Sequence, residues 1–257
     1  MSMKIASWNV NSLKVRLPQV LEWLHEKSPD LLCLQETKLA DEKFPVAELA
    51  AAGYHALYHG QPTYNGVAML SRIAPEDGRC DWPDGGDGQA RLCAGTFAGI
   101  RVVNVYVPNG QSLESDKYPY KLQWLERLRA LVASELERWP QLLLVGDFNI
   151  APDDRDVFDP VAWGEDVLCS PRERAALAAL LGLGLLDSWR QMHGDLQEWS
   201  WWDYRAAGFR RNRGLRIDLI LASTALLPVI RNVVIDRNAR AAERPSDHAP
   251  VYIELQE

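Results

Sequence analysis

The residues with the clearest chemical potential lie near the end of the chain, in the motif Pro245-Ser246-Asp247-His248-Ala249-Pro250. An imidazole can act as a general acid or base when a carboxylate holds it in one tautomer. Asp218 is a candidate for that carboxylate. Three further polar stretches, around Asn9, Glu36 and Asp147, each follow a run of apolar residues. We therefore expect one site that is assembled from residues far apart in the sequence.

Two carboxylates, Glu36 and Asp247, are candidates for binding a divalent cation. Carboxylate and amide oxygens are the ligands that Mg²⁺ and Mn²⁺ prefer, and such ions usually bind one or two carboxylates and keep room for phosphate and water. Each of the two residues follows or adjoins an apolar run that is typical of a buried strand. Taken alone, Glu36 is also open to a second interpretation, as the cap of the next helix.

His248 and the loop Gly146-Asp147-Phe148-Asn149 are open to structural interpretations when each is taken alone. An isolated histidine is more often a satisfied residue at a strand edge, and Asp-x-Asn sequences make ordinary turns. Together, the carboxylate of Asp147 and the amide of Asn149 could orient a water molecule and protonate a leaving oxygen. Ser246 stands two residues from His248, but the chain lacks the Gly-x-Ser-x-Gly elbow of serine hydrolases, so we set that chemistry aside.

A basic cluster follows a run of aromatic residues in an otherwise acidic chain. The formal charge is −7, which is atypical of proteins that coat nucleic acid without specificity. After the aromatic stretch 189–204 come five arginines: Arg205, Arg210, Arg211, Arg213 and Arg216. Such a cluster is usually a solvated face. Cations beside stacking rings also suit the phosphates and bases of a nucleic acid.

The elements that must position these residues alternate between short strands and helices. Residues 4–10 and 31–36 are expected strands, joined by a helix that ends near Lys27, and this crossover predicts neighbouring strands in one sheet. Periodic leucines predict a long amphipathic helix over 120–139. The capping box Ser170-Pro171-Arg172-Glu173 predicts a second helix that runs to about Gly182. Further strands are expected at 141–145, 217–222, 229–235 and 251–255.

The region between residues 54 and 107 has a different pattern. Four short apolar segments, 54–58, 66–71, 91–97 and 100–107, are separated by turns, and this spacing predicts an antiparallel meander. The sequence Phe97-Ala98-Gly99-Ile100 is a hairpin candidate.

Composition bounds the remaining possibilities. The chain has 257 residues, of which 47% are hydrophobic, so it can bury a large core, and we expect one domain. Four scattered cysteines, Cys33, Cys80, Cys93 and Cys169, form no CxxC pair, so zinc is not expected and a reducing compartment fits best. The N-terminus lacks a signal-peptide pattern and no apolar run is long enough to span a bilayer, so we expect a cytoplasmic chain without a membrane anchor.

In their order, these motifs strongly resemble the exonuclease III family of apurinic/apyrimidinic endonucleases, within the wider endonuclease, exonuclease and phosphatase superfamily. The resemblance spans Lys4 to Glu254. It rests on Trp8-Asn9-Val10-Asn11, Gln35-Glu36-Thr37-Lys38, 104–110, Gly146-Asp147-Phe148-Asn149, 200–205, 212–218 and 246–250. The tract 201–218 is the narrower marker of the DNA repair branch. Asn11 stands where some relatives carry an acid.

The resemblance implies a four-layered α/β sandwich, in which two mixed sheets pack face to face with helices on both outer surfaces. It also implies a bound Mg²⁺ ion, with Mn²⁺ as a possible substitute. Glu36 would bind this ion, and Asn9 and Asp247 would lie in or near its coordination shell.

The same resemblance implies roles for the remaining polar residues. Asp218 would orient His248, and Asp147 would activate the attacking water or protonate the leaving group; whether Asp147 or His248 is the base stays open. Asn149 would position the water or phosphate. The scissile phosphate would be held by Tyr106 and Asn109, and a pocket for an extrahelical sugar without its base would be formed by Trp201, Leu215 and Ile217.

The implied function is Mg²⁺-dependent hydrolysis of phosphodiesters in duplex DNA by a monomer. It would act as a 3′–5′ exonuclease or 3′ phosphatase, as an endonuclease at abasic sites, or as both. Two alternatives stay open: a phosphoinositide or sphingolipid phosphatase or phosphodiesterase of the same superfamily, and a DNA-binding module with a vestigial catalytic site.

Overall fold

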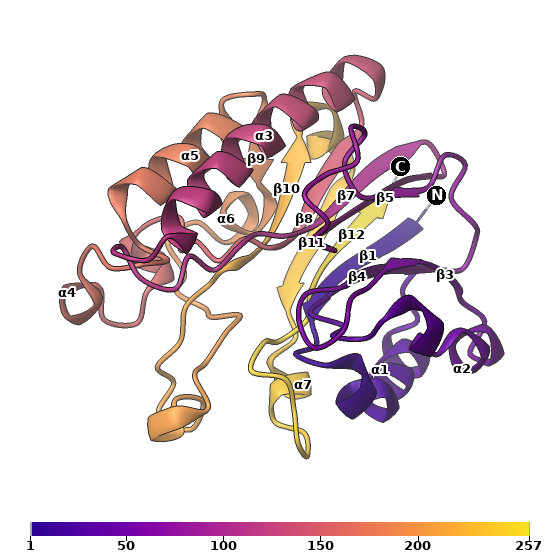
Figure 1. Ribbon diagram of the computed structural model, residues 1–257, viewed down its shortest axis with the longest axis horizontal. Coiled ribbons are helices and arrows are strands. Elements are labelled where there is room, and N and C mark those ends of the chain that lie inside the picture. The colour runs from indigo at the N-terminus through magenta and orange to yellow at the C-terminus, as the bar shows by residue number, and fades with distance from the viewer. Residues whose placement is uncertain (1, 257) are drawn as a thin grey trace.

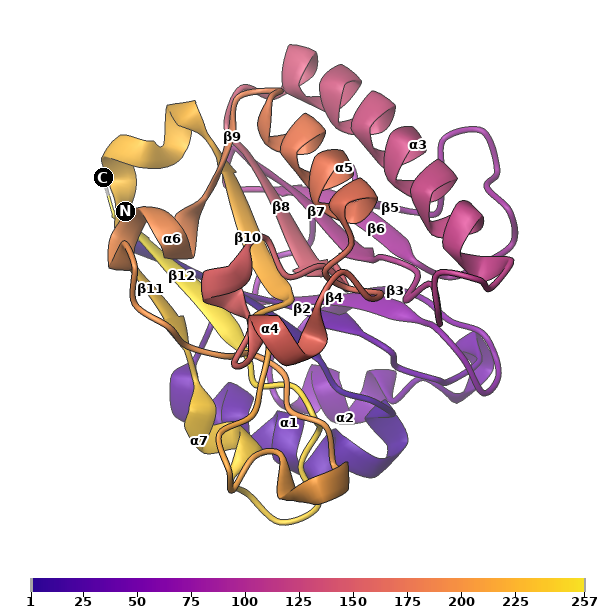
Figure 2. The same cartoon turned by 90° about the vertical axis from the view of Figure 1, so that its left-hand side faces the viewer.

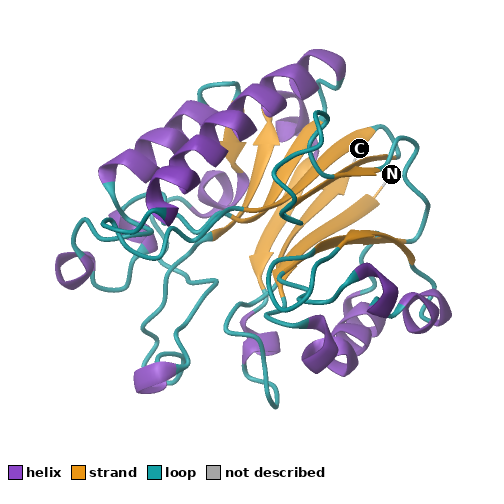
Figure 3. Cartoon of the chain, in the orientation of Figure 1, coloured by secondary structure: helices purple, strands orange, loops and turns teal. Residues whose placement is uncertain are grey.

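Two six-stranded sheets form the centre of the computed structural model, which describes residues 2–256 (Figures 1 and 3). The first sheet has the order β11 (Ile230–Ile235), β12 (Val251–Gln256), β1 (Ser2–Asn9), β2 (Leu31–Gln35), β4 (Val67–Ser71) and β3 (His55–His59). The second has the order β5 (Arg79–Cys80), β6 (Leu92–Phe97), β7 (Ile100–Tyr106), β8 (Leu142–Asp147), β10 (Asp218–Ser223) and β9 (Leu185–Asp187).

Helices cover the outer face of each sheet (Figures 1 and 2). The first sheet is covered by α1 (Leu13–Lys27) and α2 (Val46–Ala51), and the second by α3 (Lys117–Arg138) and α5 (Pro171–Leu181). Short helices α4 (Pro160–Trp163), α6 (Ser188–His193) and α7 (Arg237–Arg240) lie in the connections. One buried apolar cluster fills the space between the sheets, and two others lie under the helices. This arrangement confirms the predicted four-layered α/β sandwich.

The predicted crossover at the N-terminus is present. β1 and β2 pair in parallel, and α1 returns the chain between them. The helix ends at Lys27 because Ser28, with φ of 47°, turns left-handed while its N–H bonds the carbonyl of Leu24. The predicted capping box at Ser170 is also present, since its hydroxyl accepts from the N–H of Glu173 and the Glu173 carboxylate accepts in return.

The predicted meander over residues 54–107 is wrong. β3 pairs with β4 in the first sheet, whereas β6 pairs with β7 in the second. Each hairpin is local and was predictable, and the turn between β6 and β7 has positive φ at Ala98 and Gly99, as a two-residue hairpin of type I′ requires. The chain changes sheets between the two hairpins. That change is set by packing between the layers, which strand spacing does not encode.

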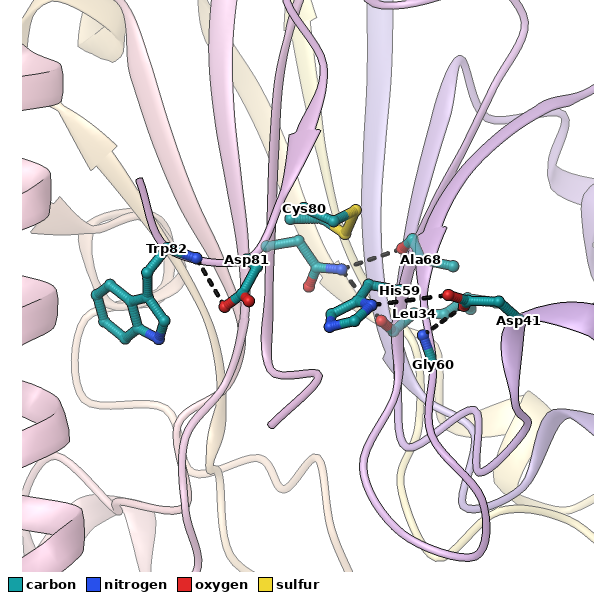
Figure 4. The surroundings of a disulfide bond; sticks show 10 residues. Leu34, Asp41, His59, Gly60, Ala68, Cys80, Asp81 and Trp82 are labelled. Carbon is teal, nitrogen blue, oxygen red and sulfur yellow. Dashed lines mark hydrogen bonds and ion pairs between the residues drawn. A yellow bond between two sulfur atoms is a disulfide. The ribbon is translucent and has the colours of Figure 1, made fainter. Parts of the chain in front are cut away.

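A disulfide between Cys80 and Cys93, which the sequence analysis did not predict, joins directly paired residues of β5 and β6. Figure 4 places it between Trp82 on one side and Ala68 of the first sheet on the other. Disulfides are rare in reducing compartments, so the cysteine pattern no longer supports the expectation of such a compartment. Cys33 and Cys169 are free thiols and buried, as predicted for Cys33.

The strand directions bring the polar stretches to one edge of the sandwich. β1 and β2 run in parallel in the first sheet, and β7 and β8 run in parallel in the second, so all four end on the same side. β10 runs opposite to β8 and begins there, with Asp218 paired to Asp147. Two connections, 203–213 and the segment around α7, extend beyond the sheets at this edge (Figures 1 and 2). Between residues 2 and 256, no helix is long and apolar enough to cross a bilayer.

Candidate active site

The carboxamide of Asn9 joins the two sheets at this edge. Asn9, the last residue of β1, is fully buried, and its Nδ2 donates to Glu36 Oε1 at 2.9 Å and to Asp147 Oδ2 at 2.8 Å. Glu36 directly follows β2 of the first sheet, whereas Asp147 ends β8 of the second. The structure therefore brings together two predicted carboxylates that come from different sheets.

The predicted partner of His248 is in place. The imidazole Nδ1 lies 2.8 Å and 3.1 Å from the two carboxylate oxygens of Asp218, and Nε2 lies 3.8 Å from Asp147 Oδ2. Ser246 has a structural role, because its buried hydroxyl donates to the carbonyl of Asn9 and accepts from the N–H of His248. This bonding agrees with the prediction that Ser246 is not a nucleophile.

Burial and charge act in opposite directions on His248. Burial lowers the pKa of this imidazole, but the carboxylates of Asp218 and Asp147 outweigh burial and raise the pKa to about 10. For Asp147, burial raises the pKa to about 7, and Asp218 adds to the rise while His248 and Asn9 oppose it. The imidazole is therefore held in its charged form between two acidic groups at neutral pH.

Glu36 is the most accessible acid in the cluster. Its Oε2 lies 2.8 Å from Lys38 Nζ, and its side chain is 17% exposed, against 1% for Asp147. Burial favours a raised pKa for Glu36, but the charge of Lys38 and the bond from Asn9 prevail and lower the pKa below its usual value. Glu36 therefore presents an ionised carboxylate at the opening of the site.

The acidic cluster has the chemistry of a site for a hard divalent cation. Ligand atoms of Glu36, Asp147 and His248 lie within 4.8 Å of one another. Such a cation needs only one or two carboxylates beside phosphate oxygens and water, so the carboxylates of Glu36 and Asp147 fit the predicted ion. The charged imidazole of His248 has no free lone pair for it. Asp247 is not one of these three residues. Its Oδ1 accepts from Asn11 Nδ2, and its Oδ2 accepts from Trp201 Nε1.

Several residues of the site have a left-handed backbone conformation. Asn11, Glu36, Lys38 and Asn149 all have φ between 43° and 53°, in the left-handed region. A residue other than glycine costs about 1–2 kcal/mol in this conformation. Strain of this kind persists where the surrounding structure enforces it, and it clusters at functional sites.

The predicted phosphate-binding residues form a second group beside the acids. Asn149 Nδ2 donates to the carbonyl of Val107, and its Oδ1 accepts from Asn109 Nδ2 at 2.9 Å. Burial, together with the charges of Glu36 and Asp147, holds the pKa of Tyr106 well above its usual value. Its phenol therefore stays protonated and can donate a hydrogen bond.

A cavity of about 740 Å³ opens next to Tyr106 and Asn109. Sequence reasoning missed one of its cations, Arg91, whose guanidinium lies 4.7 Å from the centre of the Tyr106 ring and donates to the Tyr106 carbonyl. Lys117 also lines the cavity. Both cations lack a carboxylate within 4.0 Å among residues 2–256.

The predicted arginine cluster divides into two kinds of residue. Arg210, Arg211 and Arg213 are exposed on the connection 203–213, and Arg205 there is paired with Asp203. Arg216 corrects the prediction of a DNA contact. It is 1% exposed, and its guanidinium bonds the carboxylates of Asp156, which is buried, and Asp187, which is 12% exposed. It therefore has no surface to offer a phosphate.

The three residues predicted to form an abasic-sugar pocket lie together. Trp201 pairs with Leu215 through the backbone, and both belong with Ile217 to one apolar cluster. Leu215 and Ile217 are 0% and 2% exposed, whereas Trp201 is half-buried. Only the indole of Trp201 therefore faces the surface in this conformation.

Two supporting residues were also missed. The hydroxyl of Ser200 accepts hydrogen bonds from the backbone N–H groups of Ile217 and Asp218, and these bonds fix the start of β10. Arg16 of α1 donates to the carbonyls of Asn11 and Pro245 and so connects two loops of the site. The position of Ser200 at the start of the motif 200–205 was the available signal. Arg16 gave none, because its partners are distant in the sequence.

Comparison with known proteins agrees with this geometry. The model of the Endonuclease/Exonuclease/phosphatase family matches residues 6–248. The chain belongs to this family. The chain is 39% identical to Exodeoxyribonuclease III of Haemophilus influenzae, over 98% of the chain and 100% of that protein. DNA repair nuclease APEX1 of Danio rerio is 31% identical over 99% of the chain and 82% of its own length. These matches confirm the predicted exonuclease III branch of the family, so the chain is a nuclease.

Solved structures of the same family superpose closely. The 3′ phosphatase NExo from Neisseria, bound to a product DNA hairpin, has a TM-score of 0.98 and 49% identity over 99% of the chain and 100% of its own. The AP endonuclease from Archaeoglobus fulgidus has a TM-score of 0.93 and 38% identity, again over 99% of this chain and 100% of its own. Both similarities cover the two sheets and the edge where the acids meet.

Proposed function

We propose that this nuclease is a Mg²⁺-dependent DNA repair enzyme that hydrolyses phosphodiesters of duplex DNA, chiefly at 3′ ends. The observation that carries the proposal is the meeting of Glu36, Asp147 and His248 within 4.8 Å, with Asp218 behind the imidazole. Phosphoester hydrolysis needs an activated water, stabilisation of charge on the non-bridging oxygens and protonation of the leaving oxygen. This group of side chains can supply each of these.

Each residue has a role that follows from its position. Water adds to phosphorus as the bond to O3′ breaks, and the ionised form of Asp147 takes the proton of that water, oriented by the amide of Asn149. The charged imidazole of His248, held by Asp218, attracts the non-bridging oxygens and gives its Nε2 proton to the leaving O3′. The proton that Asp147 takes from the water then restores the charge of the imidazole. Tyr106 and Asn109 donate to the same phosphate from the side of the cavity.

The divalent ion belongs on the side of Glu36. When bound, such an ion polarises a phosphoryl oxygen and offsets the charge that develops there. Glu36 would hold it, with Asn9 adjoining. Asp247, through Asn11 and Trp201, would keep the neighbouring loop in place.

Two observations favour 3′ ends over abasic sites as the main substrates. The 3′ phosphatase NExo is more similar to this chain than the Archaeoglobus AP endonuclease, at 49% against 38% identity. In addition, Leu215 and Ile217 are buried, so an extrahelical sugar would have to displace packed side chains to enter beside Trp201. A 3′ end requires no such opening. A cytoplasmic location and a monomeric state stay predictions.

The test is a parallel assay of three duplexes that contain a 3′ phosphate, a recessed 3′ hydroxyl or an internal abasic analogue, each with Mg²⁺ and with EDTA. We expect both 3′-end substrates to be processed at least tenfold faster than the abasic duplex, and EDTA to stop all turnover. Faster cleavage of the abasic duplex would reverse the assignment. Absence of turnover on all three would remove the proposal.

A further inference from the structure

A fully buried ammonium group lies directly behind the phosphate-binding amides. Lys121 of α3 is 0% exposed, and its Nζ donates to the carbonyl of Asn149 at 2.6 Å, to the carbonyl of Asn109 at 3.1 Å and to Glu173 Oε1 at 2.5 Å. These three bonds use all three hydrogens of the ammonium. Two of them go to the two residues whose side chains line the candidate phosphate site.

The partner carboxylate of Glu173 is equally buried and fully bonded. On α5, its Oε1 also accepts the N–H of Leu168, and its Oε2 accepts the N–H and the hydroxyl of Ser170. The Ser170 hydroxyl in turn lies 2.6 Å from that of Tyr118, on the first turn of α3. The pair therefore joins both outer helices to the loops of the site.

A buried ion pair of this kind needs an explanation other than stability. Desolvation of two charges usually offsets their attraction, and apolar replacements are often as stable. A helix cap at Ser170 would need only an acceptor at position 173, which an uncharged amide could provide. The charge on Glu173 is needed for Lys121, and Lys121 is needed for the two carbonyls.

The backbone conformation of Asn149 shows why its carbonyl needs a buried donor. Its φ of 49° is left-handed, which turns its carbonyl inward to Lys121 while its side chain bonds Asn109. The three donors of an ammonium let one group hold two loops that are 40 residues apart in the sequence. Without it, both carbonyls would be buried without this donor, and the peptide group that follows Asn149 would lose this restraint.

We propose that Lys121 and Glu173 form a positioning pair, which holds the amides of Asn109 and Asn149 in the geometry that the phosphate requires. This inference rests on the proposed function. The pair touches neither substrate nor ion, so it acts only through the two asparagines. Displacement of a reacting group by about 1 Å can lower the rate on the order of 100-fold.

The chain offers a matched control on the same strand and helix system. Arg101 of β7 and Glu135 of α3 form another buried pair, 1% and 4% exposed, with Nε 2.6 Å from Oε2. Arg101 lies at the opposite end of β7 from Tyr106. Loss of this pair therefore disturbs the packing of α3 against the same sheet but leaves the edge with the site untouched.

The experiment compares the double variants Lys121→Met/Glu173→Gln and Arg101→Met/Glu135→Gln, each of which removes both charges of one buried pair. In the control, the outer partners Asp77 and Arg79 keep their charges, but they are 40% and 29% exposed and therefore solvated. On the 3′-phosphate duplex we expect kcat of the first to fall about 10- to 100-fold with KM changed less than threefold. The control should keep kcat within twofold. Thermal unfolding of both variants shows whether either has lost its fold.

Hydrogen exchange gives a second readout that does not depend on turnover. In the first variant, the backbone N–H groups of residues 107, 109–111 and 147–151 should exchange at least tenfold faster than in the wild type, and in the control they should not. Unchanged exchange in these loops would overturn the inference, as would a kcat equal to that of the control. A wild type without turnover would instead remove the proposed function, and the exchange data would still decide the role of the pair.

Discussion

The two sheets end at the site in different environments. The first presents Glu36, which is 17% exposed and lies beside Lys38, 27% exposed. The second presents Asp147 and Asp218, with side chains 1% and 0% exposed, and their charges act on an imidazole that is itself buried. An ion that arrives from solvent needs the first kind of environment. A proton that must stay on one nitrogen needs the second, because charges interact more strongly where water is excluded.

This comparison assigns separate tasks to the two sheets. The side of the first sheet would hold the cation, and the side of the second would set protonation and grip the phosphate. At the site, Asn9 links the two sides through its bonds to Glu36 and Asp147. Deeper between the sheets, Gln35 of β2 donates to Asn104 of β7. Variants on the side of the first sheet should therefore change the metal dependence of the activity. Variants on the side of the second sheet should change its pH dependence.

The largest effect is expected for Glu36→Gln. Loss of the accessible carboxylate should lower Mg²⁺-dependent kcat at least 1,000-fold, because charge stabilisation is the largest contribution to this type of catalysis. Cleavage of the 3′-phosphate duplex measures it. As a control, Glu254→Gln on β12 changes an acid of the same sheet that pairs with Lys4, away from the site, and should keep normal turnover. Activity within tenfold of the wild type would show that the first sheet does not hold the ion.

The next largest effect is expected for Asp218→Asn. It should lower kcat about 100-fold, because the imidazole of His248 loses the carboxylate that orients it. The same variant tests the charge of His248. Since its pKa is raised to about 10, the imidazole is charged at pH 7 and loses its proton only as the pH rises toward 10. NMR titration of the metal-free protein should show this, and in Asp218→Asn the transition should move down toward the usual pKa near 6.5. A wild-type transition below pH 7 would contradict the assigned role of the second sheet.

A smaller effect is expected from the exposed connection 203–213. Replacement of Arg210, Arg211 and Arg213 by alanine should raise KM about tenfold with little change in kcat, since exposed cations contribute to DNA binding and not to the chemical step. Binding to an undamaged duplex, measured against salt, should show a slope lowered by about one for each arginine that contacts a phosphate. An unchanged slope would place the DNA elsewhere, and a fall in kcat alone would place these arginines in the chemistry.

Local patterns in the sequence predicted the three longest helices, most of the strands and the polar ends of the strands. The capping box at Ser170, the periodic leucines of α3 and the turn at Gly99 each fix a short segment through contacts with its neighbours. Patterns of this kind do not say which sheet a hairpin joins. The wrong meander and the unpredicted bond between Cys80 and Cys93 both come from that limit.

The burial of charged side chains was the second feature that the sequence analysis did not predict. Arg216 belongs to a run of arginines, and only the folded chain brings Asp156 and Asp187 around it. Lys121 offered a better signal. It lies on the inward face of α3 with Tyr118, Trp124 and Leu125, where a lysine requires a buried partner. A charged residue in the apolar stripe of a helix therefore indicates a buried partner of opposite charge, even before the fold is known.

The central claim is that groups from the two sheets act on one phosphate. The most direct test is single-turnover cleavage of the 3′-phosphate duplex in Mg²⁺ by Glu36→Gln on the first sheet, by Asp147→Asn on the second and by the double variant. Residues that act as a unit are strongly non-additive, so we expect the double variant to be about as slow as the slower single variant. Effects that multiply in the double variant, or a single variant within tenfold of the wild type, would contradict a shared site.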